Sequence, residues 1–193
     1  MAAHGVIVRR LEAIENLGSI DILCTDKTGT LTRGAISLTA VLNPAGTPSA
    51  RIAEIAAINA GFAKGGGNPL DEAILHSARA SGVDPASWEL LRDMPYDFER
   101  KRSTVVARHC KSGVVRAIAK GAFDNILAIC GEAGTLDDHA KLDETGREAL
   151  QQLYRTKGEE GYRVLGLAER CLQPGEDPMA LAEERFVFTG FLL

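Results

Sequence analysis

Apolar residues recur at helical spacing in four parts of the chain. Between Ser49 and Phe62, the residues Ile52, Ile55, Ala56 and Ile58 form one apolar stripe, which predicts an amphipathic helix. A second helix is predicted from Pro69 to about Ala80, because Pro69 suits a first turn and Gly82 follows the expected end. Two more are predicted at Ala122–Cys130 and at Asp143 to about Gly158, the latter with Leu150 and Leu153 on its buried side.

Short runs of apolar and β-branched residues separate these helices and predict strands. The predicted strands are Trp88–Met94, Ser103–Arg108, Val114–Ala119 and Tyr162–Leu167. The second and third are joined by residues 109–113, whose Lys-Ser-Gly ending is typical of a hairpin turn. Hairpin-paired strands with helices between them indicate an α+β domain built on an antiparallel sheet flanked by helices.

Two further apolar runs lie toward the ends of the chain. Ser19–Thr25 is predicted to be a buried strand that leads into a polar, glycine-containing loop. Phe186–Leu193 is a second strand candidate. We expect these runs to belong to a second, incomplete α/β domain whose core is completed elsewhere. The alternative is a small self-contained domain whose own sheet holds both terminal strands.

Composition and charge exclude several classes of function. With 45% hydrophobic and 25% charged residues, the chain is typical of a globular protein, and a net charge of −4 argues against nucleic acid or anionic lipid as a partner. The four cysteines are scattered without a CxxC pair, so neither a zinc site nor a disulfide framework is expected. No stretch approaches the roughly 20 apolar residues that a membrane-spanning helix requires.

The most informative segment follows the first apolar run directly. Asp26 stands at the carboxyl end of the predicted strand, where α/β sheets place their reaction centres. Gly29 allows the backbone to approach a phosphate, and Thr28 and Thr30 supply donors. Asp26 is therefore a candidate nucleophile that would form an acyl phosphate.

The residue two positions after Asp26 separates two kinds of chemistry. Phosphatases of the haloacid dehalogenase superfamily commonly carry Asp-x-Asp, in which the second aspartate speeds hydrolysis. Here that position is Thr28, so the acyl phosphate is expected to persist. The whole segment Asp26–Thr32 (DKTGTLT) resembles the phosphorylation motif of P-type ATPases.

This resemblance implies a set of roles around Asp26. In that family the aspartate is phosphorylated by ATP and dephosphorylated in each transport cycle. Asp26 and the carbonyl of Thr28 would then hold Mg²⁺, and Lys27 and Thr30 would line the phosphate pocket. By the same resemblance, residues 1–33 are the first piece of a haloacid-dehalogenase-like phosphorylation domain. Residues 34–185 form the nucleotide-binding domain, and residues 186–193 return to the phosphorylation domain.

Two later segments resemble the family's nucleotide site. Asp97–Val105 (DFERKRSTV) resembles the segment in which a phenylalanine, here Phe98, stacks on adenine while basic residues meet the phosphates. An aromatic face beside several cations suits a polyanion with a flat base. The candidates behind Phe98 are Arg100, with Lys101 or Arg102.

The second segment, Ala119–Phe123, contains the family's Lys-Gly-Ala motif. Lys120 would supply charge, and Gly121 would let a base or ribose lie close to the backbone.

Two weaker resemblances complete the predicted site. Gly161–Ala168 resembles the strand whose arginine, here Arg163, contacts the nucleotide phosphates. Asn68–Ile74 resembles the helix start that places an acid near the adenine amino group. Asp71 is the better-aligned candidate and Glu72 the alternative. An acid at a helix start is also favoured simply by the helix dipole.

The flanks of these motifs resemble the bacterial magnesium-translocating subfamily most. This implies ATP and Mg²⁺ as cofactors, and partners in the remaining phosphorylation, actuator and transmembrane domains of one polypeptide. The intact protein would lie in the cell membrane with this segment on the cytoplasmic side, and the segment alone is expected to be inactive. The alternatives are a stand-alone phosphatase of the dehalogenase type and a non-catalytic module that binds a protein through its basic loop.

Overall fold

The computed structural model describes residues 16, 18–26, 30–31, 36–63, 68–80 and 85–193. The chain divides into two units, residues 1–35 and residues 36–193. Each unit is considered by itself.

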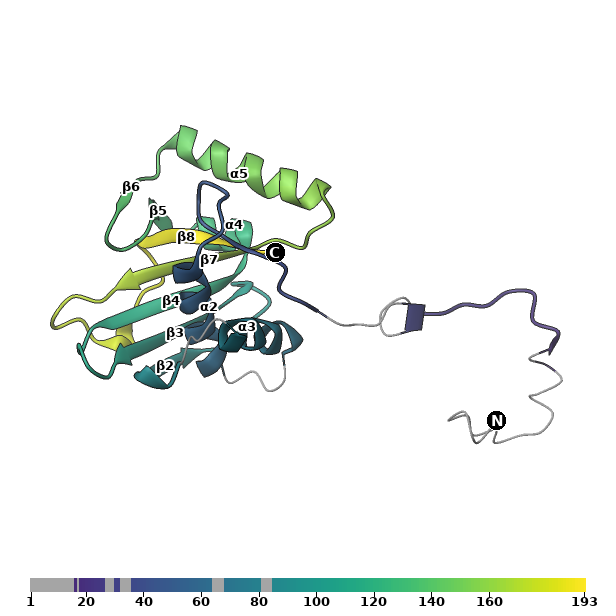
Figure 1. Ribbon diagram of the computed structural model, residues 1–193, viewed down its shortest axis with the longest axis horizontal. Coiled ribbons are helices and arrows are strands. Elements are labelled where there is room, and N and C mark those ends of the chain that lie inside the picture. The colour runs from purple at the N-terminus through teal and green to yellow at the C-terminus, as the bar shows by residue number, and fades with distance from the viewer. Residues whose placement is uncertain (1–15, 17, 27–29, 32–35, 64–67, 81–84) are drawn as a thin grey trace. The chain divides into compact units, whose positions relative to one another are not determined.

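The larger unit is built on a mixed sheet of eight strands in the described part of the chain (Figure 1). The strand order is β2-β3-β4-β7-β8-β5-β6, and β1 pairs with β8 beside this path. All neighbours are antiparallel except β5 and β8, which are parallel. The bounds are β1 Val41–Leu42, β2 Trp88–Met94, β3 Arg102–His109, β4 Val115–Ala122, β5 Cys130–Gly134, β6 His139–Lys141, β7 Leu165–Cys171 and β8 Phe186–Leu192.

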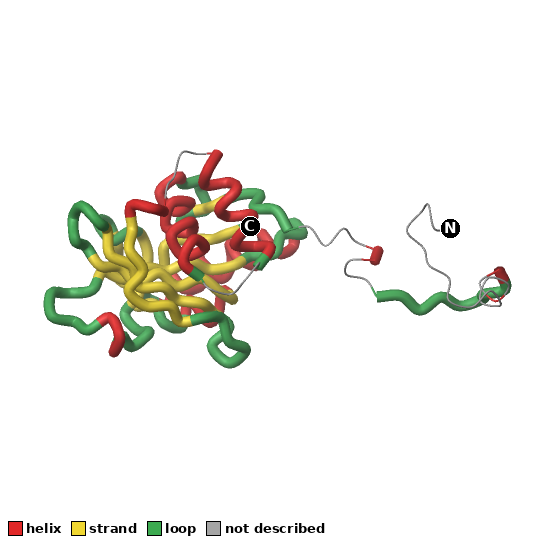
Figure 2. Tube along the Cα trace, turned by 90° about the horizontal axis from the view of Figure 1, so that it is seen from below, coloured by secondary structure: helices red, strands yellow, loops and turns green. Residues whose placement is uncertain are grey.

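Helices cover both faces of this sheet (Figures 1 and 2). On one face lie α2, Ala50–Phe62, and α3, Pro69–Ala80; on the other lie α4, Phe123–Leu127, and α5, Glu144–Glu159. Helix α5 begins where the Asp143 carboxylate accepts a hydrogen bond from the Gly146 amide at 2.8 Å, which caps the helix start.

Alternating side chains of the strands divide the core into two clusters. In β3, Val105 and Ala107 pack with the α2 and α3 side, whereas Val106 packs on the opposite side with Phe123. This follows from the two-residue period of a strand. The α4 and α5 side is rich in aromatic rings, with Phe123 in contact with Phe188 and Phe191 at centroid distances of 5.8 and 5.6 Å.

Most predicted elements are confirmed. Helices α2, α3 and α5 and strands β2, β3 and β4 lie within a few residues of the predicted ranges. The predicted strand Tyr162–Leu167 begins later, at Leu165. Strands β5 and β6 were not predicted, because Cys130–Gly134 contains two glycines and a glutamate and has no apolar run.

The placement of the last strand corrects the sequence prediction. Phe186–Leu192 was expected to leave this domain, yet β8 pairs with β1, β5 and β7 and all seven of its residues are buried. This strand has neighbouring strands on both edges and helices on both faces. A strand in such a position needs a continuous apolar sequence, and Phe186–Leu192 has one. The strand is therefore integral to this sheet. The self-contained alternative placed both terminal runs in the sheet, and of the two only this one forms a strand of it in the described part of the chain.

A second predicted strand, in the smaller unit, is not confirmed. Ser19–Thr25 was expected to be a buried strand, but these residues form no strand in the described part of the chain. Ile22 and Leu23 are 82% and 76% exposed. A strand needs a neighbour for its backbone hydrogen bonds and an apolar cover for its side chains, and the described residues of this unit provide neither.

Candidate functional site

Three of the predicted nucleotide-binding segments meet at one end of the sheet. Because β3 and β4 are antiparallel, Arg102 pairs with Gly121 and Ser103 with Lys120. Strand β7 is the next strand of the sheet, and its first residue, Leu165, pairs with Ala122 at the end of β4. Arg163 lies two residues before Leu165. The start of β3, the end of β4 and the start of β7 are therefore neighbours, although they come from distant parts of the sequence.

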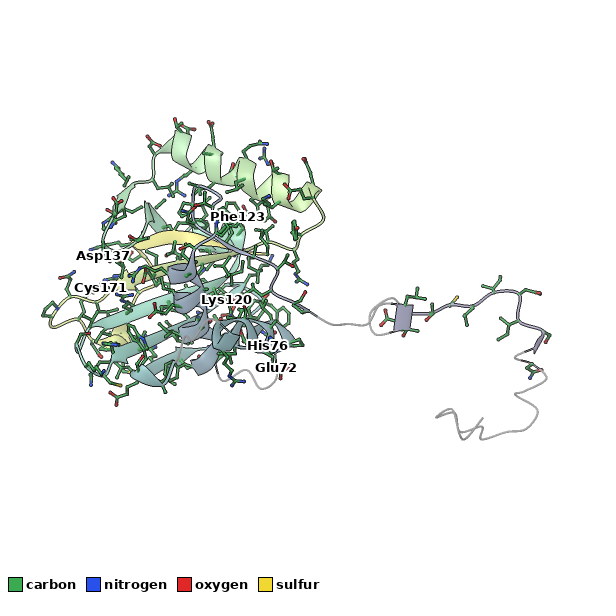
Figure 3. All side chains as sticks on the ribbon, viewed as in Figure 1. Glu72, His76, Lys120, Phe123, Asp137 and Cys171 are labelled. Atoms are coloured by element: carbon green, nitrogen blue, oxygen red, sulfur yellow. The ribbon has the colours of Figure 1, made fainter. Side chains whose placement is uncertain are left out.

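Lys120 is a buried cation with a defined partner. It lies on the face covered by α2 and α3, is 4% exposed, and forms an ion pair with Asp71 in the first turn of α3 (Figure 3). Burial lowers the pKa of Lys120, and the neighbouring Asp71 carboxylate opposes that shift. Of the two acids predicted at this helix start, Asp71 is thus the one that contacts Lys120, whereas Glu72 is exposed.

Phe98 stands at the tip of a tightly hydrogen-bonded turn between β2 and β3. The Asp97 carboxylate accepts from the amides of Glu99 at 2.9 Å and Arg100 at 2.7 Å. The carbonyl of Asp97 accepts from the Lys101 amide at 2.8 Å. Phe98 is 85% exposed, so its ring is available as a stacking surface on a turn held by three hydrogen bonds.

Tyr96 is a further aromatic residue at this turn, and it was not predicted. Its ring meets that of Phe98 edge to face, with a centroid distance of 5.8 Å. The position of Tyr96, two residues before Phe98, was the signal that could have identified it.

The three basic residues of this segment differ in their surroundings. Arg100 and Arg102 are partly buried and bind the same carboxylate, that of Glu183. Lys101, in contrast, is exposed and has a backbone φ of 50°, in the left-handed region. Glu183 was not predicted, since nothing in its local sequence points to β3.

The close approach of the β3 backbone requires a glycine at position 121. A side chain there would bring a Cβ to 2.3 Å from the Lys101 carbonyl oxygen and 2.6 Å from Arg102 Cα. The sequence prediction explained Gly121 by the approach of a base or ribose. In the structure, the close approach is that of the β3 backbone, at the turn that carries Phe98.

We expect Gly121→Ala to destabilise the domain by about 1–3 kcal/mol, because the added methyl group overlaps backbone atoms that cannot rotate away. Chemical denaturation measures this effect. Gly131→Ala is the matched control, since Gly131 lies in β5 of the same sheet and a Cβ there meets nothing within 4 Å. A Gly121→Ala variant of unchanged stability but weaker nucleotide binding would instead assign Gly121 to the ligand.

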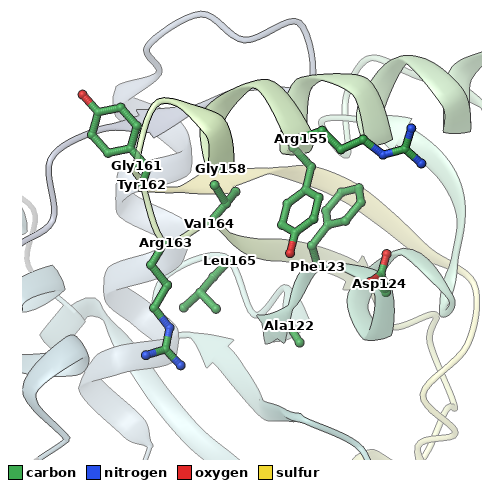
Figure 4. A pocket seen from close by; sticks show the side chains of 11 residues that line it. Ala122, Phe123, Asp124, Arg155, Gly158, Gly161, Tyr162, Arg163, Val164 and Leu165 are labelled. Atoms are coloured by element: carbon green, nitrogen blue, oxygen red, sulfur yellow. The ribbon is translucent and has the colours of Figure 1, made fainter. Parts of the chain in front are cut away.

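A pocket of about 550 Å³ opens between α4, α5 and the start of β7 (Figure 4). It contains Phe123 and Tyr154, which stack at a centroid distance of 4.5 Å with an interplanar angle of 11°. Of the predicted nucleotide-binding residues, Arg163 alone lines it, and its side chain extends away from α5 in Figure 4. Phe98, Lys120 and Asp71 do not line this pocket, so we place the candidate site at Phe98 and Lys120 rather than in the cavity.

The predicted phosphate acceptor lies in the smaller unit. Asp26 and Thr30 are described and exposed. Lys27 and Thr28 lie outside the described residues, so the predicted Mg²⁺ ligands and phosphate pocket stay predictions. The described residues contain no group of three or more His, Cys, Asp or Glu side chains that could hold a metal ion.

Comparison with known proteins decides the family. The family described as P-type ATPase, cytoplasmic domain N, matches residues 53–192. The chain belongs to this family. The resemblance inferred from the motifs is therefore confirmed, and residues 53–192 are a domain N.

The relatives of this domain N include magnesium transporters. The chain is 34% identical over 195 residues to "Magnesium-transporting ATPase, P-type 1" of Salmonella typhimurium LT2, covering 100% of the chain and 22% of the relative. It is 35% identical over 196 residues to the protein of that name from Escherichia coli K12, with the same coverage. It is 30% identical to "Probable cation-transporting ATPase I" of Mycobacterium tuberculosis H37Rv, covering 91% of the chain and 12% of the relative.

The chain thus spans about a fifth of the length of these magnesium-transporting relatives. None of its described helices is both long enough and apolar enough to cross a membrane.

Proposed function

We propose that this chain is the ATP-binding cytoplasmic part of a P-type cation pump, and that the nucleotide base stacks on Phe98. The observation that carries the proposal is the strand register, because it brings the Phe98 turn, Lys120 and Arg163 to one end of the sheet. An exposed ring on an ordered turn suits a base, and cations nearby suit its phosphates. Lys101 and Arg163 are exposed and form no ion pair within the described part of the chain.

We further propose that Asp26 accepts the γ-phosphate of ATP in the intact pump. The carboxylate attacks the phosphorus, a P–O bond to ADP breaks, and an acyl phosphate forms on Asp26. Thr28 in place of a second aspartate supports a phosphoenzyme that persists. Asp26 and the carbonyl of Thr28 would hold Mg²⁺, which would supply charge neutralisation on the transferred group.

The cation is proposed to be Mg²⁺, because the names of two of the relatives reported above specify magnesium transport. The intact protein is then a pump of the cell membrane, and this segment faces the cytoplasm. Its partners are the remaining phosphorylation, actuator and transmembrane domains of the same polypeptide.

Titration of the chain with ATP tests nucleotide binding. We expect NMR signals of residues 96–102 and 119–122 to shift. Phe98→Ala is expected to weaken ATP binding about 10- to 100-fold, since stacking of a base on an aromatic ring is worth about 1–3 kcal/mol. Because Phe98 is so exposed, its loss is expected to change the free energy of unfolding by less than about 0.5 kcal/mol.

Val114→Ala provides the control for this titration. Val114 is also exposed and apolar, but it lies in the β3–β4 hairpin, at the other end of these strands. Its replacement is expected to leave ATP binding unchanged. ATP that shifts no signal near Phe98 or Lys120, or binds the Phe98→Ala variant as tightly as the wild type, would refute the proposed site.

A further inference from the structure

Glu183 joins three side chains of the β3 segment through one carboxylate. It lies between a short 3₁₀ turn, Pro178–Ala180, and β8. Its Oε2 accepts from Arg100 Nη1 at 3.1 Å and from Arg102 Nη2 at 2.8 Å, and its Oε1 accepts from the Thr104 hydroxyl. The Glu183 side chain is 10% exposed, so both oxygens are satisfied inside the protein.

The same contacts occupy the two arginines. Arg100 also binds the Asp97 carboxylate and donates to the Pro95 carbonyl at 2.7 Å. Arg102, whose side chain is 13% exposed, donates to the Asn125 carbonyl at 3.4 Å. Two guanidinium groups are therefore balanced by two carboxylates. The Arg100 donors and the Nη groups of Arg102 donate within the protein, whereas the buried Arg102 Nε has no partner among the described residues.

These contacts connect Glu183 to the position of Phe98. Arg100, on the β3 side of the turn, binds the Pro95 carbonyl and the Asp97 carboxylate on the β2 side. Glu183 in turn binds the side chains of Arg100 and Arg102. Removal of the Glu183 carboxylate leaves two partly buried cations without their shared partner. The expected response is that the arginines turn toward water and the turn loses its fixed shape.

We propose that Glu183 is a positioning residue for nucleotide binding. It anchors Arg100 and Arg102, and through them it holds the turn that presents Phe98 to the base. The proposal rests on the function proposed above and refines it. Arg100 and Arg102 act by shaping the base site, and the cations that face the phosphates are the exposed Lys101 and Arg163.

Binding of adenosine and ATP to the folded chain separates these roles. We expect Glu183→Ala to lower the affinity for adenosine and for ATP by about the same factor, roughly tenfold. Both ligands carry the same base, and a displaced Phe98 would weaken its stacking. Glu183→Gln keeps the shape and one acceptor oxygen, so its effect is expected to be about threefold. Glu184→Ala is the matched control, because Glu184 is the adjacent, exposed acid. This variant is expected to bind adenosine and ATP as tightly as the wild type does.

A second measurement reports on the turn itself. Amide hydrogen exchange of Glu99 and Arg100, whose N–H groups donate to Asp97, is expected to speed up in Glu183→Ala more than exchange in the central strand β8 does. If Glu183 merely stabilised the whole domain, its replacement would speed up amide exchange in the turn and in β8 alike. The ligand affinity of the folded molecules would then be unchanged.

Acidification provides a third measurement, of stability. Burial alone would raise the pKa of Glu183, but hydrogen bonds from Arg102, Thr104 and Arg100 outweigh burial and lower it. The stabilisation by its carboxylate is therefore complete above the unfolded-state pKa of about 4.3 and is lost as pH falls through the lowered native pKa. The stability difference between wild type and Glu183→Gln should shrink over that acidic range. Asp97, whose pKa is also lowered, binds the same Arg100 as Glu183 and titrates in both proteins.

Several results would overturn the positioning role while the proposed function stands. One is that the Glu183→Ala variant binds adenosine as tightly as the wild type does, while the Phe98→Ala variant binds adenosine weakly. Another is a loss of ATP affinity in Glu183→Ala that greatly exceeds its loss of adenosine affinity. That result would indicate that the arginines contact the phosphates. If Glu183→Ala does not fold, unchanged affinity of the Glu183→Gln variant is decisive against the role. If the wild-type chain binds neither ligand, the proposed function itself fails.

Discussion

Asp26→Asn is expected to abolish phosphoenzyme formation in the intact pump. Asparagine keeps the size and shape of the side chain, but its amide is not a nucleophile toward phosphorus. With ATP labelled at the γ-phosphate, the wild type should acquire acid-stable, hydroxylamine-sensitive label, and the variant should acquire none above background. ATP binding to the nucleotide site should persist in the variant, because Phe98 and Lys120 are unchanged.

Asp21→Asn is the matched control for this experiment. Asp21 is an exposed aspartate five positions earlier in the same unit, and the substitution makes the same chemical change. It is expected to leave labelling intact. Label retained in the Asp26→Asn variant would show that another group accepts the phosphate, and loss in both variants would indicate a general defect of this segment.

Lys120→Ala is expected to have the largest effect on stability. Lys120 and Asp71 are a buried pair, and removal of one partner leaves the other charge uncompensated, which typically costs about 3–5 kcal/mol. Urea denaturation of the wild type and the variant measures this difference. The same substitution removes a cation from the proposed site, so ATP binding by the molecules that stay folded is expected to fall as well.

Two comparisons separate the structural effect of Lys120 from its effect on the ligand. Arg108→Ala breaks an exposed pair with Glu89 between β3 and the edge strand β2, and is expected to cost less than about 1 kcal/mol. The double variant Asp71→Leu/Lys120→Met removes both charges and should recover much of the stability without recovering ATP binding. A double variant that binds ATP normally would show that this pair serves folding alone.

Much of the fold was predictable because its causes are local. The apolar stripe of α2, the proline at the start of α3 and the aspartate before α5 are properties of short segments. The short runs of apolar and β-branched residues in β2, β3 and β4 are equally local. The order of the motifs from Asp26 to Arg163 was also visible along the chain, and the family match to residues 53–192 confirms the resemblance inferred from it.

The role of each basic residue near Phe98 was not predictable in the same way. Sequence places Arg100, Lys101 and Arg102 side by side as equivalent cations. In the folded chain, Glu183 occupies both arginines and the left-handed backbone at Lys101 leaves that side chain exposed. Glu183 is separated from them by about 80 residues, and local sequence carries no information on such a contact.

By itself, the sequence determined which segments become helices or strands and which residues can carry phosphate and nucleotide chemistry, because these depend on side-chain type and spacing. Only the tertiary structure decided that Phe186–Leu192 lies between β7 and β5, that Gly121 serves the neighbouring strand, and that Asp71 neutralises Lys120. Each of these depends on which distant segments become neighbours. That choice is made by the packing of the whole core, in which no single segment determines its own partners.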